Sequence, residues 1–423
     1  MPATAACLQT RYRSPGLRWQ HRRCTPTVNQ MIRSLLGHDR PPVDINSPLT
    51  LAAAILVAVI GPEVFIVQPG FVQGMVAYYG FSEAQAGYVA SAEMWGLALT
   101  TLLMSVLASR IDWRTLLLAS TLVVVAGNLG SLGTQEPGAF AAWRFVAGLG
   151  CGVLVSLSFT MVGLTANPDR NFGYLMAAVL SYGAIVLWLM PTAFDRVGMQ
   201  GVIIFFALFP LVALPLLRYL PGSGTGHAES VSAAVDLGGP MKSLGIATML
   251  AYFLAQGAVW AYLFLIGMAG GVSEQGVANG LMLSQFLGVA GAVVPALLAN
   301  RFGRIAPLCL GLAGAIVPLL FLYGQFSAAA FAVTVCVYNF AWNMTHPYLL
   351  GAMTSFDRSG RLVAHAVSAQ MLGLAIGPAL AASALDGNDY ATVLGLGIAL
   401  FALAWLLILP PLVAARRRAI NGV

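Results

Sequence analysis

Charged residues are scarce in this chain. Asp, Glu, Lys and Arg make up 9% of its 423 residues and hydrophobic residues 59%, whereas a soluble domain carries roughly a quarter charged residues. The scarcity excludes a soluble protein. The apolar residues form continuous runs close to the ~20 residues that a helix needs to cross a ~30 Å hydrocarbon layer. They lack the alternation of strands in a membrane β-barrel. The composition therefore predicts an all-α membrane protein.

Sequence signals for enzyme chemistry are also missing. Cys7, Cys24, Cys151, Cys309 and Cys336 have no metal-ligand spacing, and the last three lie in apolar runs, where thiols pack as small hydrophobic groups. The chain has no Gly-x-x-x-x-Gly-Lys-Ser/Thr loop for ATP and no Ser-His-Asp set. We therefore expect no cofactor, no metal and no enzyme activity.

The apolar runs predict twelve transmembrane helices in two sets of six. The first set is Leu49–Val72, Gly87–Leu107, Thr115–Leu132, Ala139–Leu164, Tyr174–Met190 and Val202–Tyr219. The second set is Leu244–Met268, Val277–Leu298, Pro307–Tyr323, Ala328–Met353, Val363–Leu385 and Ala391–Val413. Pairs of glycines three or four residues apart, such as Gly148/Gly152 and Gly373/Gly377, predict close approach of neighbouring helices.

The loop from Pro221 to Met241 divides the two sets and has the Gly, Ser and mixed-charge composition of a flexible linker. The resulting domain prediction is a basic cytoplasmic tail at 1–46, a six-helix half at 47–219, a linker at 220–243, a second six-helix half at 244–414 and a basic tail at 415–423. Up to about residue 38 the first tail is rich in Arg and contains no Asp or Glu. Met31 is an alternative start.

The positive charges follow an insertion pattern. Seven arginines precede the first predicted helix, Arg416, Arg417 and Arg418 follow the last, and the other basic residues fall mostly in alternate loops. By the positive-inside rule, both termini are cytoplasmic. The net charge of +6 therefore records topology, with some attraction to anionic lipid, and indicates no nucleic-acid partner. We expect a multi-pass protein of the inner or plasma membrane that is a monomer.

Two basic positions recur at one spacing. Arg110 and Arg301 lie about 191 positions apart, as do Arg170 and Arg361. Each pair falls in corresponding loops of the two six-helix sets. This spacing predicts two pseudo-symmetric halves, as in secondary transporters built from repeats.

The loop after the second helix of each half carries a recognisable motif. The second-half copy reads Asn300-Arg301-Phe302-Gly303-Arg304, and the first-half copy reads Ser109-Arg110-Ile111-Asp112-Trp113-Arg114. With two six-helix halves and a central linker, this motif resembles the major facilitator superfamily over about residues 47 to 415. The first-half copy departs from the family motif at Ser109 and Asp112. The resemblance implies a gate on the cytoplasmic side, formed by the loop residues Arg110, Arg114, Asn300, Arg301, Gly303 and Arg304.

A second motif lies in the fourth helix. Residues 144–152 read Arg-Phe-Val-Ala-Gly-Leu-Gly-Cys-Gly, which is similar to the Arg-x-x-Gln-Gly-x-Gly motif of proton-coupled members of that family, with Ala147 in place of the Gln. The resemblance implies proton coupling.

Three ionisable residues lie deep within the apolar segments of the first half. Counting ~1.5 Å per residue from the outer helix ends places Glu63, Glu93 and Arg144 in roughly the same layer, where an isolated charge costs at least a few kcal/mol. One arginine cannot neutralise two carboxylates, so the acid left without a partner gains affinity for a proton. We hypothesise that these residues form a proton-coupling site. A static ion pair that fixes helix packing is the alternative.

Polar and aromatic side chains mark a predicted substrate cavity. Asn339, Asn343 and His346 share one face of the tenth helix, next to a break at Pro347. Gln285 aligns with Glu93 at an offset of about 192, so an amide in the second half corresponds to an acid in the first. Together with weaker candidates, the predicted cavity residues are Tyr182, Tyr252, Gln256, Trp260, Gln285, Asn339, Asn343, His346 and Gln370. An interhelical hydrogen-bond seam is the alternative for the tenth-helix stripe.

These patterns predict a secondary transporter that moves a small aromatic or amphipathic solute by alternating access, with proton coupling and a slight preference for efflux. One alternative is a proton symporter that imports an organic anion such as an aromatic acid, with Arg144 binding the carboxylate. Sodium coupling is a second. A membrane receptor or sensor that binds its ligand without net flux is a third.

Overall fold

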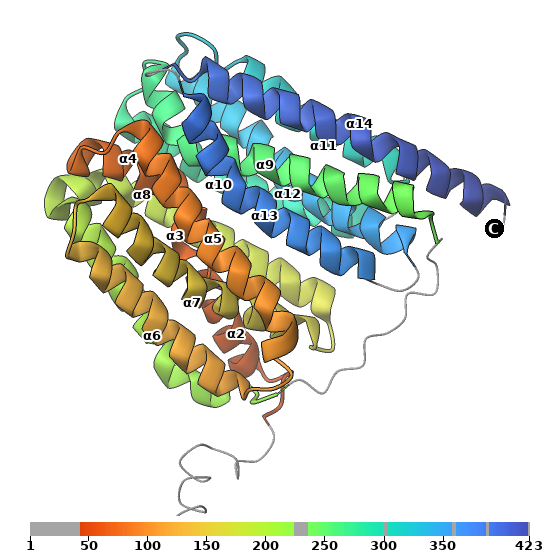
Figure 1. Cartoon of the computed structure of the whole chain (residues 1–423), viewed down its shortest axis with the longest axis horizontal. Coiled ribbons are helices and arrows are strands. Elements are labelled where there is room, and N and C mark those ends of the chain that lie inside the picture. Colours follow the sequence, from red (N-terminus) through yellow and green to blue (C-terminus); the bar gives the residue numbers. More distant parts are fainter. Residues whose placement is uncertain are drawn as a thin grey trace, which may run out of the picture. The chain divides into compact units, whose positions relative to one another are not determined.

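The computed structural model describes residues 43–223, 236–298, 301, 303–357, 361–385 and 389–421. The predicted N-terminal tail up to residue 42, both candidate start residues and the gate residue Asn300 lie outside this part of the chain. The described part is helical almost throughout (Figure 1). We call residues 43–223 the N-half and residues 236–421 the C-half.

The first predicted segment of the N-half is divided into three short helices. The backbone leaves helical geometry at Pro62 (φ −93°, ψ 22°) and again at Val67 (φ −105°, ψ 15°). Proline causes the first break because it lacks an N–H and collides with the preceding turn. The pieces are α2 (Pro48–Ile60), α3 (Glu63–Ile66) and α4 (Gln68–Tyr79).

The other predicted N-half segments are each occupied by helix. The fifth segment and the first part of the sixth lie in one long element, α8, which is interrupted at Gly198 (φ 65°, ψ −177°), a conformation that glycine adopts without a Cβ clash. The rest of the sixth segment is 3₁₀ helix. The elements are α5 (Glu83–Leu107), α6 (Trp113–Leu132), α7 (Pro137–Gly163), α8 (Pro168–Leu208) and the 3₁₀ helix η1 (Phe209–Tyr219).

The C-half has one helix for each predicted segment. Prolines stand inside five of these helices, among them Pro347 at the predicted break. In the described residues of the two halves together, seven helical stretches are long and apolar enough to cross a membrane. The C-half helices are α9 (Gly239–Ala269), α10 (Glu274–Leu298), α11 (Ile305–Leu320), α12 (Ala328–Phe356), α13 (Arg361–Ala384) and α14 (Ala391–Asn421).

The helices pack in matching pairs in the two halves. In the N-half α7 packs against α5 and α6, and in the C-half α12 packs against α10 and α11. Between the halves α5 packs against α13 and α8 against α10, which are again equivalent pairs. Gly80 (φ 68°) and Gly271 (φ 89°) follow α4 and α9 at positions about 191 apart. The pseudo-symmetric all-α fold predicted from the sequence is therefore confirmed.

Glycines allow α5 and α7 to approach closely. A Cβ on Gly148 would overlap the carbonyl oxygen of Glu93, and a Cβ on Gly96 would overlap that of Phe145. The small-residue spacing predicted for Gly148 and Gly152 therefore serves close helix contact, as is usual in membrane helices. This contact also fixes the backbone that carries Glu93 and Arg144.

Gly148→Ala should destabilise the protein by about 1–3 kcal/mol, because the new methyl group forces backbone atoms apart in a packed interface. Gly173→Ala is the matched control, since no described atom beyond its chain neighbours and its own helix backbone lies within 4 Å of a Cβ at that position. We expect its stability to be unchanged or slightly raised. Thermal unfolding in detergent, followed by tryptophan fluorescence, measures both variants. Equal unfolding temperatures would contradict the proposed tight contact.

Candidate functional site

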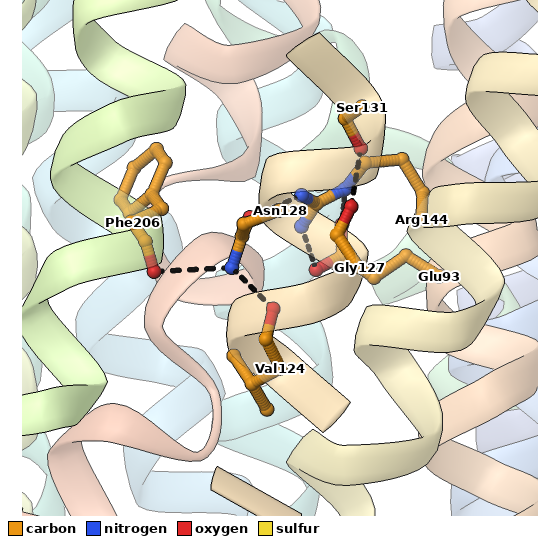
Figure 2. Close-up of polar contacts among 7 residues, drawn as sticks. All are labelled: Glu93, Val124, Gly127, Asn128, Ser131, Arg144 and Phe206. Atoms are coloured by element: carbon orange, nitrogen blue, oxygen red, sulfur yellow. Dashed lines mark hydrogen bonds and ion pairs between the residues drawn. The ribbon is translucent and has the colours of Figure 1, made fainter. Parts of the chain in front are cut away.

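A buried ion pair joins α5 and α7 of the N-half (Figure 2). Arg144 of α7 is 1% exposed. Its Nε donates to Glu93 Oε2 of α5 at 3.2 Å, and its Nη2 donates to Glu93 Oε1 at 2.5 Å. The ring of Phe71 lies 5.1 Å from the guanidinium carbon. A two-bond contact of this kind fixes the orientation of both groups.

Asn128 of α6 completes the coordination of Arg144. Its Oδ1 accepts a hydrogen bond from Arg144 Nη1 at 2.5 Å, while its Nδ2 donates to the carbonyl oxygens of Val124 at 3.1 Å and Phe206 at 3.0 Å. The two donated bonds orient the amide so that its oxygen faces the guanidinium group (Figure 2). Sequence analysis did not identify Asn128, although an amide inside the apolar run of α6 was an available signal.

Glu63 lies in the same region but outside the ion pair. It is the first residue of α3, directly after the break at Pro62, and it is 0% exposed. Neither carboxyl oxygen has a hydrogen-bond partner among the described residues. Arg144 and Glu93 are the charged groups that act on it electrostatically. The three predicted coupling residues are thus brought together, and the structure pairs Arg144 with Glu93.

A cavity of about 400 Å³ lies between the two halves. Helices of both halves line it: α3, α5, α7 and α8 on one side and α9, α10, α12 and α13 on the other. Its volume falls within the usual range for small-molecule sites. Six of the nine predicted cavity residues line it, namely Trp260, Gln285, Asn339, Asn343, His346 and Gln370.

The other three predicted cavity residues lie elsewhere. Tyr252 and Gln256 belong to a buried hydrogen-bond chain with Tyr338, in which Tyr338 donates to Gln256 Oε1 at 2.5 Å and Gln256 Nε2 donates to the Tyr252 hydroxyl at 3.0 Å. Tyr182 stacks on Phe209 with ring centroids 5.4 Å apart. The spacing of Tyr252, Gln256 and Trp260 drifts around the helix by about 40° per step, so that Trp260 alone reaches the cavity.

The two walls of the cavity differ in polarity. All of its amide side chains and its imidazole come from the C-half, where His346 Nε2 lies 2.9 Å from Gln370 Oε1. The N-half wall is apolar apart from the hydroxyl groups of Thr101 and Ser156. None of the described lining residues is Asp, Glu, Lys or Arg.

Three aromatic rings cross the boundary between the halves. Trp342 lies edge-to-face with Phe65, with centroids 6.4 Å apart, and with Trp260, with centroids 5.6 Å apart. Trp260 Nε1 donates to the carbonyl oxygen of Phe65 at 3.0 Å. That carbonyl belongs to the short helix that also carries Glu63, so cavity and ion-pair region share one structural element. Phe65 and Trp342 were not predicted as cavity residues, because single aromatic residues in apolar runs carry no distinguishing signal.

Further hydrogen bonds between the halves gather near the turns that join α4 to α5 and α9 to α10. Tyr262 donates to the carbonyl oxygen of Glu83 at 3.0 Å, and Ser91 donates to that of Ala375 at 2.6 Å. Gln275 Nε2 donates to the carbonyl oxygen of Trp188 at 3.3 Å. We call this end, which contains residues 80–82 and 270–273, the closed end.

The predicted gate loops lie toward the other end of the helices. Arg114 Nε donates to the carbonyl oxygen of Leu220 at 2.6 Å, and Arg304 donates to that of Gly351 at 2.5 Å. Both bonds remain within one half. Arg110 and Arg301 are exposed, and Gly303 has φ 66°. The gating role of these residues remains a prediction.

The chain resembles known proteins in sequence and in fold. The sequence profile of the Major Facilitator Superfamily matches residues 53–378. An uncharacterized MFS-type transporter of Enterobacter sp. (strain 638) is 25% identical over 234 residues, which are 53% of this chain and 59% of that protein. The uncharacterized transporter YycB of Bacillus subtilis (strain 168) is 30% identical over 112 residues, which are 24% of this chain and 28% of that protein. The chain thus spans less than two thirds of these relatives.

Solved structures show the same fold. The xylose transporter XylE from E. coli, in a partially occluded inward-open conformation, is 16% identical with a TM-score of 0.66, covering 84% of this chain and 95% of that one. A D-xylose–proton symporter is 15% identical with a TM-score of 0.66, covering 85% and 97%. At these identities the likeness concerns the fold alone.

Proposed function

The chain belongs to the Major Facilitator Superfamily, and from that premise we propose that it is a secondary transporter that moves a small organic solute by alternating access. The cavity between the halves supports this proposal, because a site at such an interface can open to either side as the halves rock. Hydrogen bonds between the halves at the closed end support it too. Under the predicted topology, with both termini cytoplasmic in the inner or plasma membrane, the closed end faces outward.

Transport is coupled to protons in this proposal. The observation that carries it is the burial of Glu63 without a hydrogen-bond partner among the described residues. A carboxylate at this place has no hydrogen-bond donor among the described residues and is not accessible to solvent. The neutral acid is therefore much cheaper to bury. A rearrangement that brings the Arg144 guanidinium toward Glu63 favours the carboxylate and releases the proton. Sodium coupling is the alternative for this site.

An aromatic or amphipathic solute suits the cavity better than an organic anion, and efflux of such a solute is the direction that we propose. The anion reading needs a cation in the binding site, and Arg144 is instead held by Glu93 and Asn128 outside the cavity lining. The aromatic rings and C-half amides suit an apolar body with a few oriented polar groups. The protein acts as a monomer in this proposal, with membrane lipid around it.

Reconstituted liposomes test the proposal. Purified full-length protein is inserted with a trapped pH dye, and a panel of neutral aromatic solutes is added under an imposed proton gradient and then under a sodium gradient. We expect movement of protons that depends on solute, and none driven by sodium. Solute flux driven by the sodium gradient would show that sodium, and not the proton, is the coupling ion. Binding without flux under either gradient would favour a receptor. Inverted and right-side-out vesicles then separate efflux from import.

A further inference from the structure

We infer that the cavity takes an uncharged aromatic solute with a hydrogen-bond donor on one edge, and that Gln285 accepts that hydrogen bond. The inference rests on the proposed function only in that the cavity binds a solute. It specifies the solute beyond an aromatic or amphipathic compound and assigns Gln285 the role of selecting it.

Gln285 has a hydrogen-bond acceptor without a partner among the described residues. It lies on α10, lines the cavity and is 2% exposed, and its Oε1 has no hydrogen-bond partner among the described residues. A buried acceptor without a donor costs about 1–3 kcal/mol. Rotation of the terminal amide group presents Oε1 to a solute in the cavity. A solute with an N–H or O–H group there removes the cost, whereas one without a donor leaves it. The site therefore discriminates for the donor.

The neighbouring amides are already held in place. Asn339 Nδ2 donates to Ser284 Oγ at 3.1 Å, and Asn343 Nδ2 donates to Asn339 Oδ1 at 2.8 Å. These bonds fix the polar edge of the cavity before a solute arrives, which lowers the ordering cost of binding. Among the described lining amides, Gln285 is thus the one whose carbonyl oxygen is buried without a partner.

Charge is excluded by the same lining. None of the described lining side chains is Asp, Glu, Lys or Arg, so an anion or a cation would lose its hydration without gaining a counterion. Arg144 is not available to an anion, because Glu93 and Asn128 already bind it. The solute that fits is uncharged.

The opposite wall excludes a polyhydroxylated solute. Met94, Leu97 and Val179 of the N-half line the cavity, as do the rings of Phe65 from the same half and Trp342 from the C-half. A sugar has hydroxyl groups on all its edges, and those turned to this wall would lose water without gaining a partner. A flat ring with polar groups on one edge meets both walls. This solute therefore differs in chemistry from the xylose named for the structural relatives.

Four probes test the inference on the full-length protein in nanodiscs, by isothermal titration calorimetry with empty nanodiscs as reference. They are 2-naphthamide, N,N-dimethyl-2-naphthamide, which lacks the donor, 2-naphthoate, which is anionic, and D-xylose. We expect 2-naphthamide to bind at least about tenfold more tightly than each of the others, the ratio that one unpaired acceptor produces. Tighter binding of 2-naphthoate or D-xylose, or no saturable binding of 2-naphthamide, would overturn the inference.

Variants assign the selectivity to one residue. Gln285→Leu should reduce the preference for 2-naphthamide over its dimethyl analogue to within about threefold, because the unpaired acceptor is gone. Gln68→Leu is the matched control, since Gln68 also has a buried, unpartnered Oε1 but does not line the cavity. Its preference should match the wild type. If Gln285→Leu fails to fold, Gln285→Met serves instead. A tenfold preference that survives the substitution of Gln285 overturns the role of Gln285.

This binding test and the transport test fail separately. Calorimetry needs no flux and no gradient, so the selectivity can hold when liposomes show no proton movement. In that case the proposed coupling is wrong and the inference on the solute stands. If the liposomes instead move protons with an anionic solute, the proposed coupling stands and the inference on the solute is wrong.

Discussion

Glu63→Gln should abolish accumulation of solute driven by a pH gradient and leave solute exchange between the two sides measurable. Glutamine has nearly the same shape as a protonated glutamate but cannot release a proton. Because Glu63 has no hydrogen-bond partner among the described residues, the substitution removes no hydrogen bond. We expect its thermal stability to match or exceed that of the wild type. Counterflow and gradient-driven uptake in the same liposomes measure the two activities.

Two further variants show whether the effect belongs to Glu63. Glu93→Gln removes the counterion of Arg144, so it should lower stability as well as coupling. Glu136→Gln is the surface control, because Glu136 caps α7 at an exposed position by accepting from the backbone N–H groups of Gly138 and Ala139. It should change neither activity. If Glu63→Gln keeps the wild-type dependence on pH, the proton is carried elsewhere.

The fold could be predicted because its signals are long and redundant. Each of the twelve predicted segments is occupied by helix, since a run of some twenty apolar residues has few other structures open to it in a membrane. The first segment shows what this argument misses. Its start was predicted closely, but its helices continue to Tyr79 instead of ending at Val72. The three-piece structure that presents Glu63 depends on how the chain continues after Pro62. Proline marks the position of a break and does not fix its geometry.

The sequence predicted which residues belong to the candidate site better than it predicted how their side chains pair. Scarce polar residues in apolar helices need partners or water, and this reasoning brought Glu63, Glu93 and Arg144 together from sequence alone. Which acid pairs with Arg144 depends on the approach of α5 to α7. That approach is set by Gly148 and Gly96 against backbone atoms of the other helix, a contact between residues far apart in sequence.

Helix rotation explains the cavity residues that were placed elsewhere. Tyr252 and Gln256 could equally face the cavity or a neighbouring helix, because α9 is buried nearly all round. The partner that decides between these is Tyr338 on α12, and spacing within α9 contains no information about it. The stripe on α12 was more informative because three polar residues share one face there.

Arg144→Leu should cause the largest loss of stability of any single substitution in this region. It leaves the Glu93 carboxylate buried without a counterion and removes the donor to Asn128. Breaking a buried ion pair in this way costs about 3–5 kcal/mol, whereas replacing both members by apolar residues is often nearly neutral. The double variant Arg144→Leu/Glu93→Leu should therefore recover most of the loss. Unfolding temperature and the yield of monodisperse protein in detergent measure the three proteins.

The rescued double variant separates the two readings of the ion pair. If Arg144 and Glu93 serve packing alone, a variant that folds should transport with the wild-type dependence on pH. If Arg144 is the cation that draws the proton from Glu63, the same variant should bind solute and exchange it but fail to accumulate it under a pH gradient, because no positive charge is left to favour the Glu63 carboxylate. Stability is restored in both cases, so pH-driven accumulation alone decides, and normal accumulation in the double variant would leave the pair a static brace between α5 and α7.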